Sequence, residues 1–268
     1  MQKPRIGIWI DDPVSRVLTA RYWDTLVDHG ISTAAVMLEG YEGGFDAKYN
    51  EATLERLKTF ALARDVEVVL TTWPEPNKKY MQDFESRIES YLKASGAAGL
   101  EYDAEGNWLP RRVKGYPNID VAGDDLVKVV ENIARKYDVR SELTTYPYHT
   151  ENNRRADVAP HMDRLLPQAY SVRNRESGPI AWDSQFGPGG MQKLTLDRAK
   201  QIKGPKLSCG LAAYDQVWPG KTGRDAMEVA YEAACNYELE EIRYWSSKWV
   251  LGIRKNSYSS DFLKSLAK

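Results

Sequence analysis

The sequence predicts an α/β protein, a single (β/α)₈ barrel that spans residues 1–268. Short runs rich in β-branched residues alternate with longer amphipathic runs, and eight such pairs follow one another at about 30 residues per pair. The length of 268 residues is close to the roughly 250 residues of such barrels. No linker, low-complexity segment or clear repeat divides the chain, so we expect one domain.

The first four units each pair a strand-like run with a helical one. Gly30 and Gly96 are expected to end the first and third helices, and Asn50 to cap the second. The predicted strands are residues 5–11, 33–38, 66–73 and 99–105, and the predicted helices are 15–29, 50–65, 78–95 and 124–137.

The second half continues this alternation with less regular spacing. The predicted strands are 140–148, 165–172, 206–214 and 241–249, and the helices are 158–163, 194–202 with Thr195 as its cap, 224–237 and 260–266. Two long stretches without periodicity, 106–123 and 173–192, follow strands. They are therefore expected on the face where barrels build their sites.

Composition excludes several classes of function. The net charge of −1 gives no electrostatic footprint for nucleic acid, and no apolar run approaches the roughly 20 residues that span a bilayer. The first residues lack the features of a signal peptide, so we expect synthesis in the cytoplasm. A protein of this kind that acts on the cell wall would be released by other means. Two cysteines, Cys209 and Cys235, are too few for a disulfide framework, and we expect both to be buried thiols. We also expect the protein to be a monomer.

Acids and aromatic residues dominate the carboxyl ends of the predicted strands, where barrel enzymes place their active residues. Eight Trp and 16 Tyr, against five Phe, supply rings with a polar edge that suit a ligand cleft. The expected substrate-binding residues are Asp12, Trp73, Trp108, Tyr146, Tyr148, Gln168, Tyr214 and Trp245. Basic residues are scarce at these positions, which disfavours a polyanionic substrate.

The fourth strand carries the sharpest signal, in the run Gly99-Leu100-Glu101-Tyr102-Asp103-Ala104-Glu105. Side chains alternate along a strand, so Glu101, Asp103 and Glu105 project to one face at intervals of about 7 Å. If that face is the barrel interior, three carboxylates share a space of low dielectric constant and at least one pKa rises. A carboxyl group with a raised pKa can act as a general acid near neutral pH.

This run resembles the D-G-x-D-x-D-x-E motif of the chitinase-type glycoside hydrolases of family 18, which lies on the fourth strand of a barrel. Gln168-Ala169-Tyr170 and Tyr244-Trp245-Ser246 are similar to the family's segments on strands six and eight. The resemblance implies that Glu105 is the general acid and that Asp103 orients the substrate's acetamido group, whose carbonyl oxygen attacks the anomeric carbon. It further implies that Tyr170 bonds that group, that Glu101 shares a proton with Asp103, and that Trp245 forms the floor of the sugar site.

The chain departs from this family where Ala98 replaces the leading Asp, Glu101 the first inner Asp, and Ala104 the Trp before the glutamate. A second resemblance is to the family 25 lysozymes, which share an Asp-x-Glu on strand four and acids at the end of strand one. It implies that Asp11 or Asp12 joins Asp103 around the charged transition state. Strand one lacks the usual G-x-D-x-S form.

The expected activity is hydrolysis of β-1,4 bonds in an N-acetylhexosamine polymer, with peptidoglycan as the first choice and a chitin-like glycan as the second. No cofactor or metal is expected for this reaction. Two alternatives stay open. Ala98 and Ala104 permit a barrel that binds carbohydrate without cleaving it, and Asp11, Asp12 and Glu39 permit a metal-dependent barrel enzyme acting on a small sugar or acid.

Overall fold

The computed structural model describes residues 3–39, 49–105, 108, 110–145, 158–170, 172–175, 178–181, 189–213, 223–251 and 257–267. Its main sheet is a parallel barrel, as the sequence predicts. The strands are β1 (Arg5–Ile10), β2 (Ile31–Met37), β3 (Glu67–Thr72), β4 (Gly99–Asp103), β5 (Arg140–Thr145), β6 (Arg164–Pro167), β9 (Lys206–Leu207), β10 (Cys209–Ala212) and β11 (Glu241–Trp245).

The ring closes between β6 and the segment that holds β9 and β10. Strand β9 pairs with the start of β6, and the bridge between Gln168 and Gly210 continues that pairing beyond Ser208. The amide of Ala169 donates to the carbonyl of Gly210 at 2.8 Å. Strands β9 and β10 therefore occupy the single seventh position of an eight-position barrel, the position that the sequence assigns to residues 206–214.

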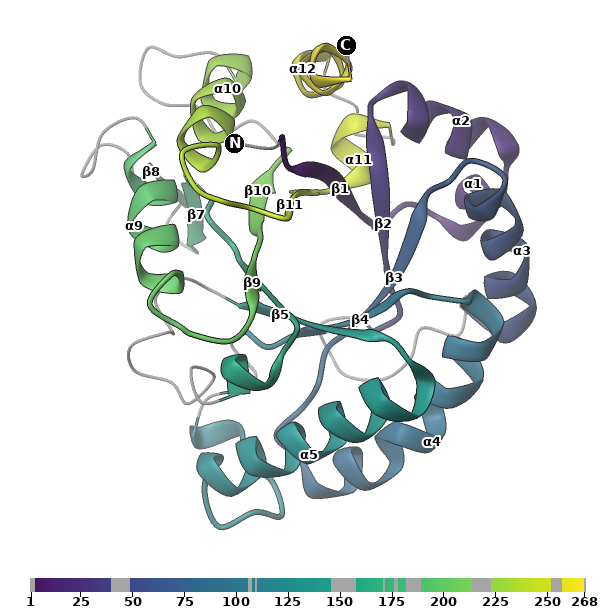
Figure 1. Ribbon diagram of the computed structural model, residues 1–268, viewed down its shortest axis with the longest axis vertical. Helices are drawn as coiled ribbons and strands as arrows, with labels where there is room; N and C mark the ends of the chain where they lie inside the picture. The colour runs from purple at the N-terminus through teal and green to yellow at the C-terminus, as the bar shows by residue number, and fades with distance from the viewer. Residues whose placement is uncertain are drawn as a thin grey trace.

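Helices surround this ring on its outside, as Figure 1 shows in a view down the barrel. They are α1 (Val14–Val17), α2 (Ala20–Asp28), α3 (Glu51–Leu62), α4 (Lys78–Ser95), α5 (Ile119–Tyr137), α9 (Gly190–Ala199), α10 (Gly223–Ala234), α11 (Ser247–Val250) and α12 (Ser257–Leu266), with short 3₁₀ turns η1 (Pro110–Arg112) and η2 (Ala159–His161). No helix within the described ranges is both long enough and apolar enough to cross a bilayer.

The helix ends confirm three of the predicted signals. Asn50 accepts a hydrogen bond from the amide of Thr53 at 2.9 Å, while Gly30 and Gly96 follow their helices with φ of +70° and +57°. The prediction for Thr195 is wrong: α9 begins one turn earlier, after Gly189, and Thr195 is buried in its interior. The apolar pattern extends beyond the polar residue that resembles a cap.

Other elements also differ from the prediction. Helix α5 begins at Ile119, inside the stretch 106–123 that is expected without periodicity, rather than at residue 124. Residues 15–29 form two helices rather than one, since the chain leaves helical geometry at Leu18 and Thr19. The stretch 173–192, expected without regular structure, contains an antiparallel hairpin of β7 (Val172–Arg175) and β8 (Gly178–Ala181). The hairpin is too short to show a clear alternation in the sequence.

The alternating strand residues divide the buried side chains into two layers. Residues such as Ile8, Leu100 and Ile242 face the helices and form the large outer core. On the inward face, Trp9, Ala35, Val69 and Leu166 form a small apolar cluster against which Trp245 packs. The outer core thus supplies most of the apolar burial, and the barrel interior is free to carry polar groups.

Below the apolar cluster the interior is filled by charged side chains. Glu101, Glu142, Arg164, Glu241 and Arg243 are all buried there and joined by ion pairs. Small residues on the neighbouring strands make room for them. A Cβ atom at Gly7 would lie 2.1 Å from Oε1 of Glu241, so a larger residue would collide with the network.

Candidate active site at the carboxyl end of the barrel

Glu101 and Asp103 lie on the inward face of β4, the orientation that the alternation predicts, and Glu105 follows two residues after the strand ends. Leu100 and Tyr102 point outward, and the Tyr102 ring lies 6.1 Å from that of Phe84 on α4. Glu101 is fully buried, while Asp103 and Glu105 are 6% and 5% exposed. The strand therefore places one carboxylate deep in the barrel and two near its carboxyl end.

Glu101 is bound by groups from four other strands. It accepts hydrogen bonds from Trp9 Nε1 at 2.9 Å and Thr71 Oγ1 at 3.0 Å, and another from Thr144 Oγ1. Arg243 Nη1 lies 2.6 Å from its Oε2 atom. Burial raises the pKa of Glu101, while the Arg243 charge and these hydrogen bonds oppose that shift.

These contacts show what surrounds Glu101. Its two oxygens accept from Trp9, Thr71, Thr144 and the guanidinium of Arg243, while the proton shared between Glu101 and Asp103 stays a prediction. The sequence pattern around Glu101 does not indicate this ion pair, because Arg243 lies 142 positions away on β11. An arginine at an inward position of a predicted strand is the signal that could have revealed its partner.

Glu105 is the outermost of the three acids. Gln168 follows β6 and lies two residues after the inward-facing Leu166. Its Nε2 atom donates to Glu105 Oε1 at 2.5 Å. Gln192 of α9 in turn donates to the carbonyl of Ala169 at 2.7 Å and ties that segment to its helix. The structure thus brings two of the predicted site residues, Glu105 and Gln168, together, with an amide donor that orients the carboxyl group.

The two acids at the end of β1 point in different directions. Asp11 accepts from Ser246 Oγ at 2.6 Å and forms an ion pair with Lys248 Nζ, so it belongs to the rim beside β11. Asp12 is buried against α2, where Tyr22 donates to it at 3.0 Å. The expected contact of Asp12 with substrate is therefore replaced by a packing role, because the alternation turns it away from the interior.

Glu39 forms a separate buried cluster behind the rim. Its Oε2 atom accepts from the amide of Trp73 at 2.6 Å and from the hydroxyl of Tyr80 at 2.7 Å. The pKa of Glu39 is raised because burial outweighs the opposing effect of these hydrogen bonds and of the Arg87 charge. Glu39, Asp11 and Asp12 thus have different partners, and the cation site expected from these three acids in one alternative does not assemble.

The three tryptophan candidates divide into one rim residue and two buried ones. Trp245 is partly exposed and packs on Trp9 with ring centroids 6.0 Å apart. Trp108 is 2% exposed and its indole N–H donates to the carbonyl of Pro74 at 2.7 Å, which makes it a packing residue rather than the expected stacking surface. Trp73 is likewise buried, above Thr71 on the inward side of β3.

Tyr170, expected to bond an acetamido group, is partly exposed two positions beyond Gln168. Tyr146, Tyr148 and Tyr214 lie outside the described residues, so their predicted contacts stay predictions. Lys248 was not predicted as a site residue. Its Nζ atom pairs with Asp11 and lies 5.8 Å from the centre of the Trp245 ring, so the rim of β11 carries a cation as well as an aromatic surface.

Comparison with known proteins supports the fold. Scans against protein-family models and curated proteins found no match. Among solved structures, a class V chitinase from Pseudomonas fluorescens is similar with a TM-score of 0.65 at 10% identity, over 98% of this chain and 99% of that one. A xylanase and α-amylase inhibitor from Scadoxus multiflorus gives 0.63 at 12%, over 98% of each chain. A broad-specificity endoglucanase from Clostridium longisporum gives 0.61 at 11%, over 99% and 95%. The chain shares the barrel fold of these proteins.

Proposed function

We propose that the protein is a glycoside hydrolase in which Glu105 is the general acid. The observation that carries the proposal is the placement of two acids at the carboxyl end of the barrel, where barrel enzymes carry their active residues: Asp103 ends β4, and Glu105 follows it and accepts a hydrogen bond from Gln168. Two neighbouring carboxyl groups are the groups that glycoside hydrolysis requires. The structural neighbours named above include enzymes that act on polysaccharides, which agrees with this chemistry.

In this proposal Glu105 protonates the glycosidic oxygen as the bond to the anomeric carbon breaks. The amide of Gln168 donates to Oε1 of Glu105 at 2.5 Å and so orients this carboxyl group, the proposed proton donor. Asp103 lies one inward position deeper and carries the negative charge that faces the developing oxocarbenium ion. Glu101 lies below it and is neutralised by Arg243, so it adds little charge of its own.

The proposed substrate is an N-acetylhexosamine polymer, with peptidoglycan ahead of a chitin-like glycan. The acetamido oxygen can attack the anomeric carbon when Asp103 and Tyr170 orient that group, and this route needs no second carboxylate nucleophile. Trp245 supplies a partly exposed ring at the rim for a sugar face. Asp11 is held by Lys248 and Ser246, which favours this chitinase-like route over one in which Asp11 joins the reaction.

The test measures hydrolysis of purified bacterial cell walls and of a soluble N-acetylglucosamine oligomer by the intact protein. Wild type is expected to release reducing ends from at least one of them, and Glu105→Gln to lose that activity while it still binds the oligomer. Glu55→Gln, a change to an exposed glutamate on α3, is the matched control and is expected to retain full activity.

The same experiment separates hydrolysis from carbohydrate binding alone. Saturable binding of the oligomer without release of reducing ends from either substrate would contradict the proposal and favour the non-catalytic alternative. Activity that disappears in excess chelator would instead favour the metal-dependent alternative.

A further inference from the structure

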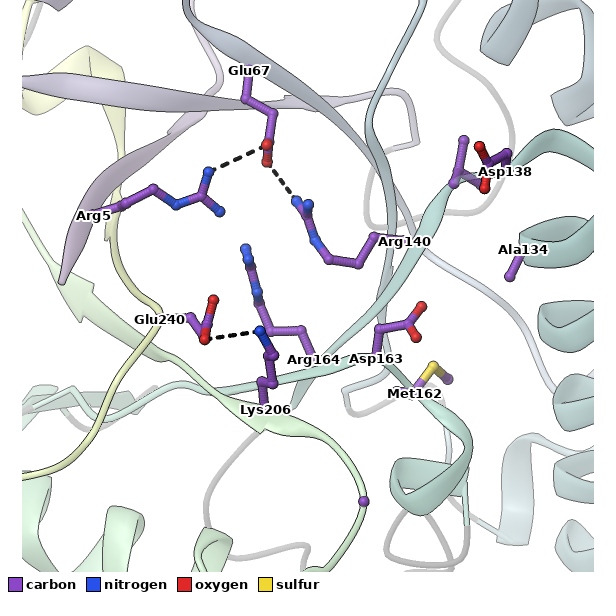
Figure 2. Close-up of a pocket in the computed structure, with 12 residues that line it drawn as sticks. Arg5, Glu67, Ala134, Asp138, Arg140, Met162, Asp163, Arg164, Lys206 and Glu240 are labelled. Carbon is purple, nitrogen blue, oxygen red and sulfur yellow. Dashed lines mark hydrogen bonds and ion pairs between the residues drawn. The ribbon is translucent and has the colours of Figure 1, made fainter.

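An open cavity of about 840 Å³ lies at the amino end of the barrel, opposite the candidate active site. Figure 2 shows the charged side chains that line it. Arg5, Glu67, Arg140, Arg164 and Lys206 are each the first residue of a strand, of β1, β3, β5, β6 and β9 respectively. The parallel barrel therefore gathers four cations at one mouth, and the proposed glycoside chemistry uses none of them.

Four acids line this cavity, and three of them, Glu67, Asp163 and Glu240, have partners among the described residues; the fourth is Asp138. Glu67 bridges Arg5 at 3.2 Å and Arg140 at 2.5 Å, as the dashed lines in Figure 2 mark. Asp163 accepts from the amide and the hydroxyl of Ser141 at 2.8 and 2.9 Å. Glu240, at the rim, pairs with Lys206 at 3.1 Å.

Arg164 extends into the space between Arg5 and Arg140 and is only 2% exposed (Figure 2). Its Nη1 atom binds two deeper carboxylates, those of Glu241 at 2.7 Å and Glu142 at 3.2 Å. Its Nε atom is buried, and no acceptor among the described residues reaches it. Buried N–H groups are almost always paired, so this donor calls for a partner other than those in the part of the chain that the structure describes.

Other guanidinium groups also act on the charge of Arg164, in addition to the two carboxylates that it binds. Burial lowers the pKa of its guanidinium, Glu142 and Glu241 oppose that shift, and the charges of Arg140 and Arg243 reinforce it. An added negative charge beside Arg164 would relieve the repulsion among the three guanidinium groups. A water molecule would satisfy the Nε donor but would leave this repulsion unchanged.

We propose that this cavity binds a tetrahedral oxyanion of the size of phosphate, which accepts from Arg164 Nε at its inner end and faces Arg5, Arg140 and Lys206 toward solvent. Guanidinium groups that approach from several sides match the acceptors of a tetrahedral anion better than those of a planar carboxylate. The site lies at the opposite end of the barrel from Glu105 and does not depend on the proposed hydrolytic activity.

The test is titration calorimetry of the intact protein with inorganic phosphate at pH 7.5, with sodium chloride adjusted to constant ionic strength. Saturable binding of one phosphate per chain is the expected result, with acetate bound at least about tenfold more weakly. The absence of saturable heat would overturn the proposal and leave water as the occupant. Equal binding of acetate would overturn the assignment of a tetrahedral ligand.

Two variants and a control locate the site. Arg164→Lys keeps a cation for Glu142 and Glu241 but loses the Nε donor, and is expected to weaken phosphate binding about tenfold or more. Lys206→Ala removes a side chain that is 69% exposed, leaves the buried network intact, and should weaken binding about two- to fivefold. Lys93→Ala, which removes a similarly exposed partner of Glu89 on α4, should have no effect. Undiminished affinity in folded Arg164→Lys would overturn the assignment, and if that variant does not fold, undiminished affinity in Lys206→Ala would do so.

Discussion

Removal of the Arg243 side chain is the perturbation that tests the buried charge network most severely. Arg243 is fully buried and its nitrogens lie 2.6, 2.8 and 2.7 Å from oxygens of Glu101, Glu142 and Glu241. Glu142 and Glu241 retain Arg164 when Arg243 is lost, whereas Glu101 has no second cation within the described part of the chain. Arg243→Met therefore isolates one buried carboxylate.

The cost of that isolation can be estimated. Breaking a buried ion pair by removing one partner costs about 3–5 kcal/mol, and we expect this loss in the free energy of unfolding at pH 7.5. The unpaired Glu101 will have a pKa above its unfolded value of about 4.3. The stability tied to a raised pKa is present below the unfolded value and is lost as pH rises toward the folded value. The difference between variant and wild type should therefore shrink at pH 5, by up to about 1.4 kcal/mol per pH unit.

The assay is urea unfolding followed by Trp fluorescence at pH 5 and pH 7.5. The double variant Arg243→Met/Glu101→Gln should recover part of the loss and most of its pH dependence, because the amide carries no charge. Arg64→Met, which breaks a partly exposed pair with Asp24, should cost less than about 1 kcal/mol. A loss below about 1 kcal/mol for Arg243→Met at pH 7.5, or an equal loss at both pH values, would refute this reasoning.

Four more predictions follow from single contacts. Trp245→Ala should weaken binding of an N-acetylglucosamine oligomer by calorimetry and leave the unfolding midpoint unchanged; unaltered affinity would assign Trp245 to packing against Trp9. Trp108→Phe should leave oligomer affinity unchanged. It should lower the free energy of unfolding in urea by about 1–3 kcal/mol, because the carbonyl of Pro74 loses the indole N–H donor. Weaker oligomer affinity with unchanged stability would instead indicate that Trp108 contacts the sugar. Asp11→Asn should reduce the rate on cell walls less than about tenfold, because Asp11 serves the rim ion pair; a severe loss would favour the lysozyme-like arrangement. Burial raises the pKa of Glu142, but the charges of Arg243, Arg164 and Arg140 outweigh it and lower this pKa to about 2. The stability tied to this shift is present above about pH 4.3 and should be lost as pH falls toward 2, by on the order of 3 kcal/mol. A urea midpoint that stays constant from pH 5 to pH 2.5 would contradict this prediction.

The fold could be predicted because the apolar pattern of each unit is local. The spacing of residues such as Leu54 and Leu57 gives a helix directly, and Gly96 and Asn50 mark helix ends through their own backbone and side-chain chemistry. The hairpin of β7 and β8 and the division of the seventh strand at Ser208 were missed, because they depend on pairing with distant partners.

The candidate site could be predicted only as far as the alternation along a strand reaches. That alternation places Glu101 and Asp103 on the inward face of β4, opposite Leu100 and Tyr102, and Glu105 just beyond the end of the strand. It does not reveal that Glu101 pairs with Arg243, since that contact joins opposite parts of the chain through the barrel interior. The burial of Trp108 is equally inaccessible to the sequence, because an aromatic residue in a loop has the same pattern whether it faces a ligand or the core.

The central claim is that Glu105 delivers a proton to the leaving group, and its most direct test compares two leaving groups in Glu105→Gln. An N-acetylglucosamine oligomer needs a proton on its glycosidic oxygen, whereas a nitrophenyl glycoside of the same sugar departs as a stable phenolate. General acid catalysis contributes about 10² to 10⁴ in rate, so the variant should lose that factor on the oligomer and less than about tenfold on the nitrophenyl glycoside. An equal loss on both substrates, or normal turnover of the oligomer, would contradict the account.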